Sequence, residues 1–155
     1  MNLDALRARA AERLQPGDQY AGEVTPEEAW QILESEERAA LVDVRTDAEW
    51  AYVGMPDVSG LGKELVRISW QVFPEMDVNT AFVADVAASG CANDAPALFI
   101  CRSGARSRDA AKACAAAGYG QALNVMDGFE GPRDANGHRG AKAGWKASGL
   151  PWVQA

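Results

Sequence analysis

Short apolar runs of strand length alternate with capped helical segments through most of this sequence, and this alternation limits the possible folds most strongly. The clearest runs are Ala40–Val44, Ala97–Ile100 and Ala122–Val125. Thr25–Glu28 and Thr46–Glu49 each begin with Thr and end with Glu, the capping box that opens many helices. Strands that alternate with helices in this way form parallel sheets covered on both faces. We therefore expect an α/β fold of three layers, with a central parallel sheet of about five strands and helices on both faces.

Weaker signals extend the same pattern along the chain. Further strands are expected at 23–24 and 65–68, and Asn79 is expected to cap the helix that follows it. Residues 105–117 are rich in Ala and predict a helix that stops near Gly118. Apolar side chains in the less regular tail should fold it back over the core: Trp145, Leu150 and Trp152.

The N-terminal segment stands outside this alternation. We expect residues 1–20 to be a helical extension and residues 21–155 to be one domain, since 155 residues is a usual length for a single domain. Leucines at helical spacing in residues 2–14 indicate a short amphipathic helix. The arginines of this segment would also suit a mitochondrial-type presequence, but the acidic residues Asp4 and Glu12 make that alternative weaker.

Charge and cysteine usage exclude several kinds of partner. The formal net charge is -7 and no basic block occurs, so we expect no nucleic-acid or membrane partner. No apolar stretch approaches the roughly 20 residues of a membrane-spanning helix. Three cysteines, one histidine and no closely spaced cysteine pair predict no metal site. Free thiols and the lack of a recognisable secretory signal predict a cytoplasmic protein.

One loop carries the residues best suited to chemistry. Directly after the run Ala97–Ile100 comes a thiol followed by small, polar and cationic residues: Cys101, Arg102, Ser103, Gly104, Ala105, Arg106 and Ser107. A helix follows at once, so its free N–H groups and positive end should face the thiol. The glycine lets backbone N–H groups turn inward, and the arginines and serines add charge and donors. This pattern predicts a nucleophilic Cys101 in an anion-binding cradle, whereas an inert buried thiol is the plainer alternative.

The segment Cys101–Ser107 resembles the active-site loop of rhodanese domains, the thiosulfate sulfurtransferases. Leu41–Arg45 resembles the strand motif upstream of that loop, and Val125–Phe129 resembles the stretch after the last strand. The resemblance covers most of the chain and implies a rhodanese-like fold for residues 21–155. Two departures are visible. Gly54 stands where the family usually has His, and Asp127 replaces one of a usual pair of glycines.

The resemblance implies sulfur transfer through a persulfide on Cys101, with no organic cofactor and no metal. A small anionic donor such as thiosulfate would supply the sulfur, and a thiol or a protein would accept it. The remaining loop residues would bind the substrate: Arg102, Ser103, Gly104, Ala105, Arg106 and Ser107. Arg106 is expected to hold the loop and the anion, and Arg102 to face the entrance.

Other functions remain open at this point. Related phosphatases and arsenate reductases have one more residue between Cys and Arg, and that position is Ser107 here, so phosphoryl transfer is the weaker alternative. A persulfide carrier for one partner protein, or a rhodanese-like interaction module, would also fit the resemblance. The segment from Gly131 to Gly144 resembles an insertion and contains His138 and Arg139, which could lie near the site or in a solvated loop.

The remaining polar and sulfur candidates have mainly structural interpretations. Asp43 and Arg45 could be catalytic, but a strand-end Asp and an Arg that pairs with Glu49 are more often structural. Cys114 lies among alanines of the 105–117 helix and is expected in the core. Cys91 could resolve a persulfide on Cys101, although an ordinary surface thiol is the simpler interpretation.

Overall fold

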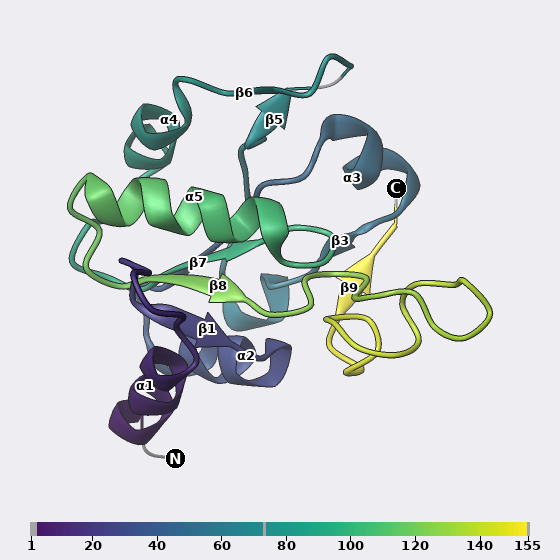
Figure 1. Cartoon of the computed structure of the whole chain (residues 1–155), viewed down its shortest axis with the longest axis horizontal. Helices are drawn as coiled ribbons and strands as arrows, with labels where there is room; N and C mark the ends of the chain where they lie inside the picture. The colour runs from purple at the N-terminus through teal and green to yellow at the C-terminus, as the bar shows by residue number, and fades with distance from the viewer. Residues whose placement is uncertain (1–2, 73, 155) are drawn as a thin grey trace.

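A five-stranded parallel sheet forms the centre of the computed structural model, which describes residues 3–72 and 74–154. Its strands are β1 (Gly22–Val24), β2 (Ala40–Asp43), β4 (Val66–Arg67), β7 (Ala97–Ile100) and β8 (Ala122–Val125). Their order across the sheet is β1-β8-β7-β2-β4, and every neighbouring pair is parallel (Figure 1). The expected parallel sheet of about five strands is therefore confirmed.

Helices cover both faces of this sheet, as expected. On one side lie α1 (Leu3–Glu12) and α2 (Pro26–Ser35), and on the other lie α4 (Phe82–Ala88) and α5 (Ala105–Ala116) (Figure 1). The short α3 (Asp47–Tyr52) follows β2 directly, and a 3-10 turn spans Ser59–Leu61. No described helix is long and apolar enough to span a bilayer, a finding limited to residues 3–72 and 74–154.

The apolar strands are buried on both faces because two hydrophobic clusters enclose them. In β7, Leu98 and Ile100 pack into the cluster beneath α1 and α2. Phe99 lies between them in sequence and packs into the opposite cluster, together with Cys101 and residues of α4 and α5. Alternate side chains of a strand point to opposite faces, so one continuous apolar run can supply both clusters. This is why the run carries no polar residue.

Both predicted capping boxes are present. Thr25 accepts a hydrogen bond from the Glu28 backbone N–H, and Thr46 accepts one from that of Glu49; each Glu side chain accepts from the backbone of its Thr.

The prediction that Asn79 caps the next helix is wrong by two residues. Helix α4 begins after Ala81, and the Asn79 side chain accepts a hydrogen bond from the Ala81 N–H, just before the helix. It therefore shapes the turn that leads into α4.

Helix α1 packs against the sheet instead of lying apart from it. Leu6 and Ala10 are completely buried in the cluster that also contains residues of α2. A Cβ atom built on Gly22 would lie 2.5 Å from the Ala10 carbonyl, so this glycine permits the close approach of α1 to β1. Arg13 of the following turn pairs with Glu28 at 2.5 Å. The boundary expected between residues 20 and 21 stays a prediction.

Two pairs of very short strands were not predicted. β3 (Met55–Pro56) pairs with β9 (Trp152–Val153), and β5 (Gln71–Val72) pairs with β6 (Asp77–Val78), both antiparallel. Strands this short carry no readable periodicity. The β3–β9 pair fixes the tail, in which Trp145 is completely buried and its ring meets that of Trp30 edge to face at 5.9 Å.

Candidate active site

The thiol of Cys101 lies at the carboxyl end of β7, where the chain turns directly into α5. Gly104 makes this turn with a φ of +113°, a conformation that favours glycine, and caps the first turn of α5. The Cys101 Sγ atom accepts hydrogen bonds from the Gly104 backbone N–H at 3.1 Å and from the Ser107 hydroxyl at 3.2 Å. The sulfur is therefore held by donors from both sides of the turn.

The segment after β8 holds the backbone of this loop in place. Phe129 N–H donates to the Cys101 carbonyl at 2.8 Å, and the N–H groups of Glu130 and Gly131 donate to the Arg102 carbonyl at 3.0 and 3.1 Å. A Cβ built on Gly128 would lie 2.4 Å from the Cys101 carbonyl oxygen, so only glycine fits there. Asp127, which replaces a usual family glycine, still adopts a positive φ of 63°. The turn is thus retained despite the substitution.

Arg106 and Glu49 join α5 to α3 beside the thiol. The two guanidinium nitrogens of Arg106 donate to the two Glu49 oxygens at 2.7 and 2.9 Å. Burial disfavours the charged carboxylate, but hydrogen bonds and charge from Arg106 outweigh this effect, so the pKa of Glu49 is lowered. The expected pairing of Arg45 with Glu49 is wrong, because Glu49 makes its ion pair with Arg106.

Asp43 and Arg45 form a completely buried ion pair at the end of β2. The Arg45 Nη2 atom donates to Asp43 at 2.7 Å and to the Gly54 carbonyl at 2.7 Å, and its guanidinium stacks 4.5 Å from the Phe129 ring centre. These contacts tie β2 to the segments around the loop, which agrees with a structural role. A Cβ on Gly54 would lie 2.7 Å from the Val153 carbonyl oxygen, so the usual family His has no room there.

A pocket of about 520 Å³ opens above the thiol. Its lining combines the loop with α3, the β5–β6 hairpin and the tail: Glu49, Val53, Gln71, Met76, Cys101, Arg102, Ser103, Ala105, Arg106, Glu130 and Arg139. Gly104 and Ser107 are buried beneath it and do not line it. Arg102 is exposed, as expected of a residue at the entrance.

The 131–144 segment reaches this pocket with one of its two candidate residues. Arg139 lines the pocket and donates to the Gly131 carbonyl at 2.7 Å. His138 is exposed, and its backbone N–H donates to the Asp134 carboxylate at 2.9 Å. Val53, Gln71, Met76 and Glu130 were missed, and Glu49 was expected only as part of a helix cap and as a partner of Arg45, because nothing in their local sequence points to the thiol. Only their tertiary positions bring them to the thiol.

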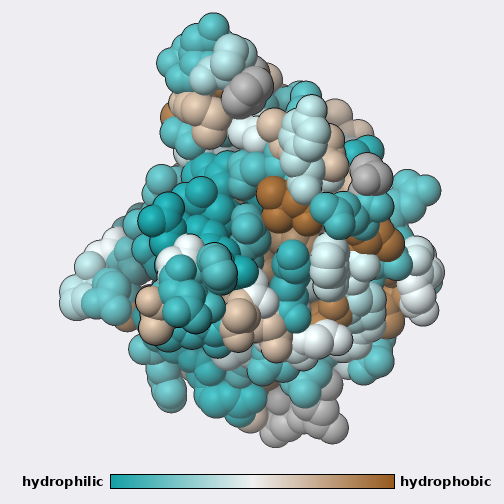
Figure 2. Space-filling view, turned by 90° about the vertical axis from the view of Figure 1, so that its right-hand side faces the viewer, coloured by the Kyte–Doolittle hydropathy of each residue, from teal (hydrophilic) through white to brown (hydrophobic). Residues whose placement is uncertain are grey.

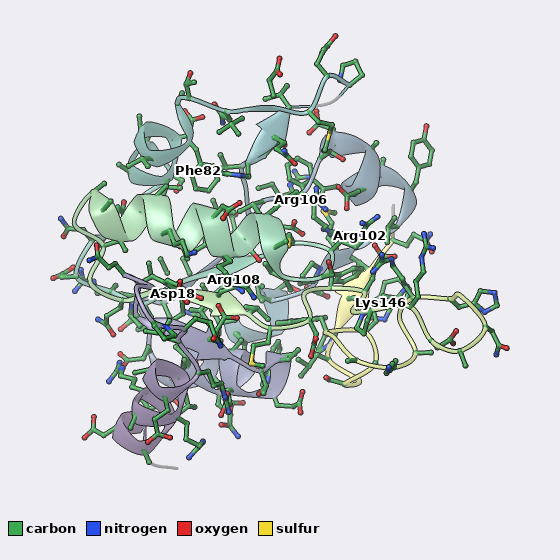
Figure 3. All side chains as sticks on the ribbon, viewed as in Figure 1. Asp18, Phe82, Arg102, Arg106, Arg108 and Lys146 are labelled. Carbon is green, nitrogen blue, oxygen red and sulfur yellow. The ribbon has the colours of Figure 1, made fainter. Side chains whose placement is uncertain are left out.

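The charged side chains of the site gather at one end of the molecule. Figure 3 shows Arg102 and Arg106 near the N-terminal end of α5, on the side that carries the C-terminal segment. Figure 2 shows the molecule from that side, where hydrophilic residues surround smaller hydrophobic groups. An anion that approaches this end meets cations from the loop, from α5 and from the tail.

The other two cysteines lie away from the pocket. Cys114 is completely buried near the C-terminal end of α5, and its burial, with a smaller effect of the charge on Cys91, raises its pKa to about 12. The hydroxyl of Tyr119, just beyond the C-terminal end of α5, donates to the Cys91 carbonyl at 2.9 Å, whereas Cys101 precedes the N-terminus of this helix. This placement gives no support to Cys91 as a resolving thiol. Among the described residues, no group of three or more His, Cys, Asp or Glu side chains is arranged to hold a metal ion.

The chain matches a known protein family and a solved structure over most of its length. A family model described as the STR4 middle domain matches residues 21–155. The chain belongs to the STR4 middle domain family. The crystal structure of Rv0390 from M. tuberculosis is 47% identical in sequence, has a TM-score of 0.79, and is matched over 88% of this chain and 99% of that one. The present chain, as a member of the STR4 middle domain family, therefore shares its fold with nearly the whole of the Rv0390 structure.

Curated relatives agree with this assignment. An uncharacterized protein of Rickettsia conorii is 38% identical over 127 residues, which cover 80% of this chain and 90% of that protein. A sulfurtransferase of Allochromatium vinosum is 30% identical over 131 residues, which cover 84% and 94%. More distant relatives include a rhodanese-like domain protein and a thiosulfate sulfurtransferase. The rhodanese-like fold implied by the sequence motifs is confirmed for this STR4-type domain.

Proposed function

We propose that this chain is a sulfurtransferase that moves a sulfane sulfur from thiosulfate, or a similar anionic donor, to a thiophilic acceptor through a persulfide on Cys101. The observation that carries the proposal is the Cys101 Sγ atom at the base of a cation-lined pocket, hydrogen bonded to Gly104 N–H and the Ser107 hydroxyl. The sulfurtransferase relatives support sulfur transfer as the general kind of reaction. That thiosulfate is the donor is the more specific part of the proposal.

The reaction has two displacements that balance in atoms and electrons. The Cys101 thiolate attacks the outer sulfur of thiosulfate, a new S–S bond forms, and the old S–S bond breaks so that sulfite leaves with its electron pair. The enzyme then carries a persulfide whose terminal sulfur is negatively charged. A thiolate acceptor attacks that terminal sulfur, takes it up as a new persulfide, and releases the Cys101 thiolate.

The surrounding residues have different parts in this scheme. The N–H of Gly104, the N-cap of α5, donates to the Cys101 sulfur, and the positive end of this helix stabilises negative charge there. Arg102 and Arg139 line the pocket and attract the anionic donor. Arg106 is bound by both oxygens of Glu49, so its first role is to hold the loop against α3. The pocket of about 520 Å³ leaves room for a thiol acceptor beside the loop.

Intact mass spectrometry after incubation with thiosulfate tests the proposal directly. The wild-type chain should gain one sulfur atom, which a reducing thiol removes, and the Cys101→Ser variant should gain none. Cys91→Ser is the matched control and should still gain the sulfur, because Cys91 lies away from the pocket. If the wild type gains nothing from thiosulfate or from mercaptopyruvate, the proposed function is wrong.

Turnover distinguishes an enzyme from a carrier once the persulfide is found. Release of sulfite in many cycles with small thiols as acceptors supports the sulfurtransferase. A stable persulfide that small thiols do not discharge identifies a carrier for a partner protein. A cytoplasmic location belongs to the same proposal, because a persulfide cycle needs reduced thiols and all three cysteines are free.

A further inference from the structure

A chain of buried polar side chains runs from Cys101, after the central strand β7, across β8 to the edge strand β1. The Ser107 hydroxyl lies 3.2 Å from the Cys101 Sγ atom and 2.5 Å from Oδ1 of Asn124. Asn124 is in the middle of β8, and its Nδ2 atom donates to the Glu23 carboxylate on β1 at 2.8 and 3.1 Å. Ser107 and Asn124 are completely buried, and Glu23 is 6% exposed. Polar groups held this deep are costly unless they are hydrogen bonded.

The orientation of the Asn124 amide is fixed by what surrounds it. Its Nδ2 atom faces three acceptor oxygens, the two of Glu23 and the Gly104 carbonyl at 3.1 Å. Turning the amide over would place Oδ1 against those oxygens, so Oδ1 must face Ser107. Glu23 is itself held by the Tyr20 hydroxyl and lies 3.5 Å from the Arg108 guanidinium. The acceptor beside Ser107 is therefore set by a residue on the first strand of the sheet.

The Ser107 hydroxyl has only one proton to donate. Three acceptors lie within its reach, the Cys101 sulfur at 3.2 Å, Oδ1 of Asn124 at 2.5 Å and the Gly104 carbonyl at 3.3 Å, so the bonds to Asn124 and to the sulfur compete. While Cys101 is a neutral thiol, the shorter contact of 2.5 Å favours donation to Asn124. When the sulfur is a thiolate, its charge attracts the proton and the hydroxyl turns toward it. The bond to Asn124 is then lost, so Asn124 opposes the stabilisation that Ser107 can give to the thiolate.

We propose that Asn124, oriented by Glu23, is a positioning residue that competes with the Cys101 sulfur for the Ser107 hydroxyl and so limits how strongly the thiolate is stabilised. The inference rests on the proposed role of Cys101 as the nucleophile. A thiolate that is less stabilised is the stronger nucleophile, because nucleophilicity falls as a thiol becomes more acidic. Once the charge moves to the terminal sulfur of a persulfide, Ser107 returns to Asn124.

The test measures the pH at which Cys101 is alkylated by iodoacetamide at half its maximal rate, in a Cys91→Ser background. Removing the nearest competitor with Asn124→Leu should lower this pH by about half a unit to one unit, since a charged thiolate then competes only with the longer contact to the neutral Gly104 carbonyl. Ser107→Ala should raise it by a similar amount. The double variant should behave like Ser107→Ala alone, because the proposal has Asn124 act on the sulfur through that hydroxyl and not through its own bond to the Gly104 carbonyl.

Asn124→Leu and Ser107→Ala add or remove no charge around the thiol, although Asn124→Leu removes one donor to Glu23. The charged groups there are the cations and carboxylates of the pocket, the buried pair on β2, and the carboxylate beyond Asn124: Arg102, Arg106, Arg139, Glu49, Glu130, Asp43, Arg45 and Glu23. A change in the alkylation profile therefore reports the altered hydrogen bond. Far-UV circular dichroism and urea unfolding check that each variant is folded.

Asn124→Ala keeps the proposal testable if the Leu variant does not fold. It also removes the acceptor beside Ser107 and places no second carboxylate against Glu23, so the half-maximal pH should fall as it does for Asn124→Leu. An unchanged or raised value for Asn124→Leu, or effects of Asn124→Leu and Ser107→Ala that simply add, would overturn the inference. Alkylation does not require sulfur transfer, so failure of wild-type persulfide formation would count against the proposed function alone.

Discussion

Arg139 and His138 are neighbours in the chain but meet different surroundings. Arg139 lines the pocket above Cys101, whereas His138 is exposed and binds the Asp134 carboxylate only through its backbone. Arg139→Ala should raise KM for thiosulfate about fivefold, since one ionic contact open to solvent contributes about 1 kcal/mol. His138→Ala is the matched control and should leave KM unchanged. Steady-state sulfite release measures both, and equal values for Arg139→Ala and wild type would remove Arg139 from the donor site.

Single residues also show why local sequence was informative for the loop and uninformative for its surroundings. Cys101, Arg102 and Arg106 lie within one short segment of the sequence, so a local pattern can indicate them. Asn124 sits in an apolar run on another strand, and nothing beside it in the sequence suggests contact with the loop. Its role depends on parallel pairing of β7 with β8, which brings Phe99 opposite Asn124.

At the scale of elements, the ion pair between Glu49 and Arg106 joins α3 to α5. Burial raises the pKa of Glu49 and Arg106 lowers it more, so the folded pKa lies below the usual 4.5. The stability contributed by the charged carboxylate is therefore present above about pH 4.5 and is lost as the pH falls through the lower folded value.

The variant Glu49→Gln should have a free energy of unfolding about 1–2 kcal/mol lower than that of the wild type at pH 7. This difference should shrink at pH 3, where the Glu49 carboxylate begins to be protonated. Urea unfolding at pH 7, 5 and 3 measures it. Glu27→Gln is the control, because Glu27 is exposed on α2, and its effect should be small at every pH. A constant difference between pH 7 and pH 3 for Glu49→Gln would show that the ion pair does not stabilise the fold.

Elements differ in how well local sequence predicts them. Helices α2 and α3 begin where their Thr and Glu residues predict, because a capping box is complete within four residues. Strands β3 and β9 lie far apart in the sequence and pair over two residues each. Their pairing is stabilised only by the tertiary fold, since an isolated two-residue pair is not stable in water.

At the scale of the whole molecule, Cys114 should report global unfolding. Its thiol is completely buried between α5 and the sheet, and burial raises its pKa to about 12. Reagents should therefore reach it only when the core opens as a unit. In a Cys101→Ser background, Cys114 should be alkylated in parallel with the loss of far-UV circular dichroism in urea. Cys91, which is partly exposed, is the internal control and should react without urea.

Alkylation of Cys114 at the rate of Cys91 in the absence of urea would show that α5 opens locally. The structure opposes that outcome, because α5 contacts β7, β8 and α4 and also bears the loop of Cys101. The same packing explains why the N-terminus of α5 can hold an anion site. A helix end that moved independently of the sheet would not keep its N–H groups aimed at one sulfur atom.

The sequence by itself determined the layered α/β fold, the capped helices and the position of the thiol loop. Each of these depends on interactions within one short segment, such as apolar periodicity, a capping box or a strand that turns directly into a helix. Local patterns of this kind remain readable whatever the rest of the chain does.

Only the tertiary structure decided which residues meet the loop. Glu49 binds Arg106, Arg139 reaches the pocket while His138 does not, and Asn124 faces Ser107. These contacts join residues far apart in the sequence. Strand order and close backbone contacts, such as that of Gly128 with Cys101, decide which residues meet. Such contacts form when the packed sheet brings the segments together, and no single segment contains the information that specifies them.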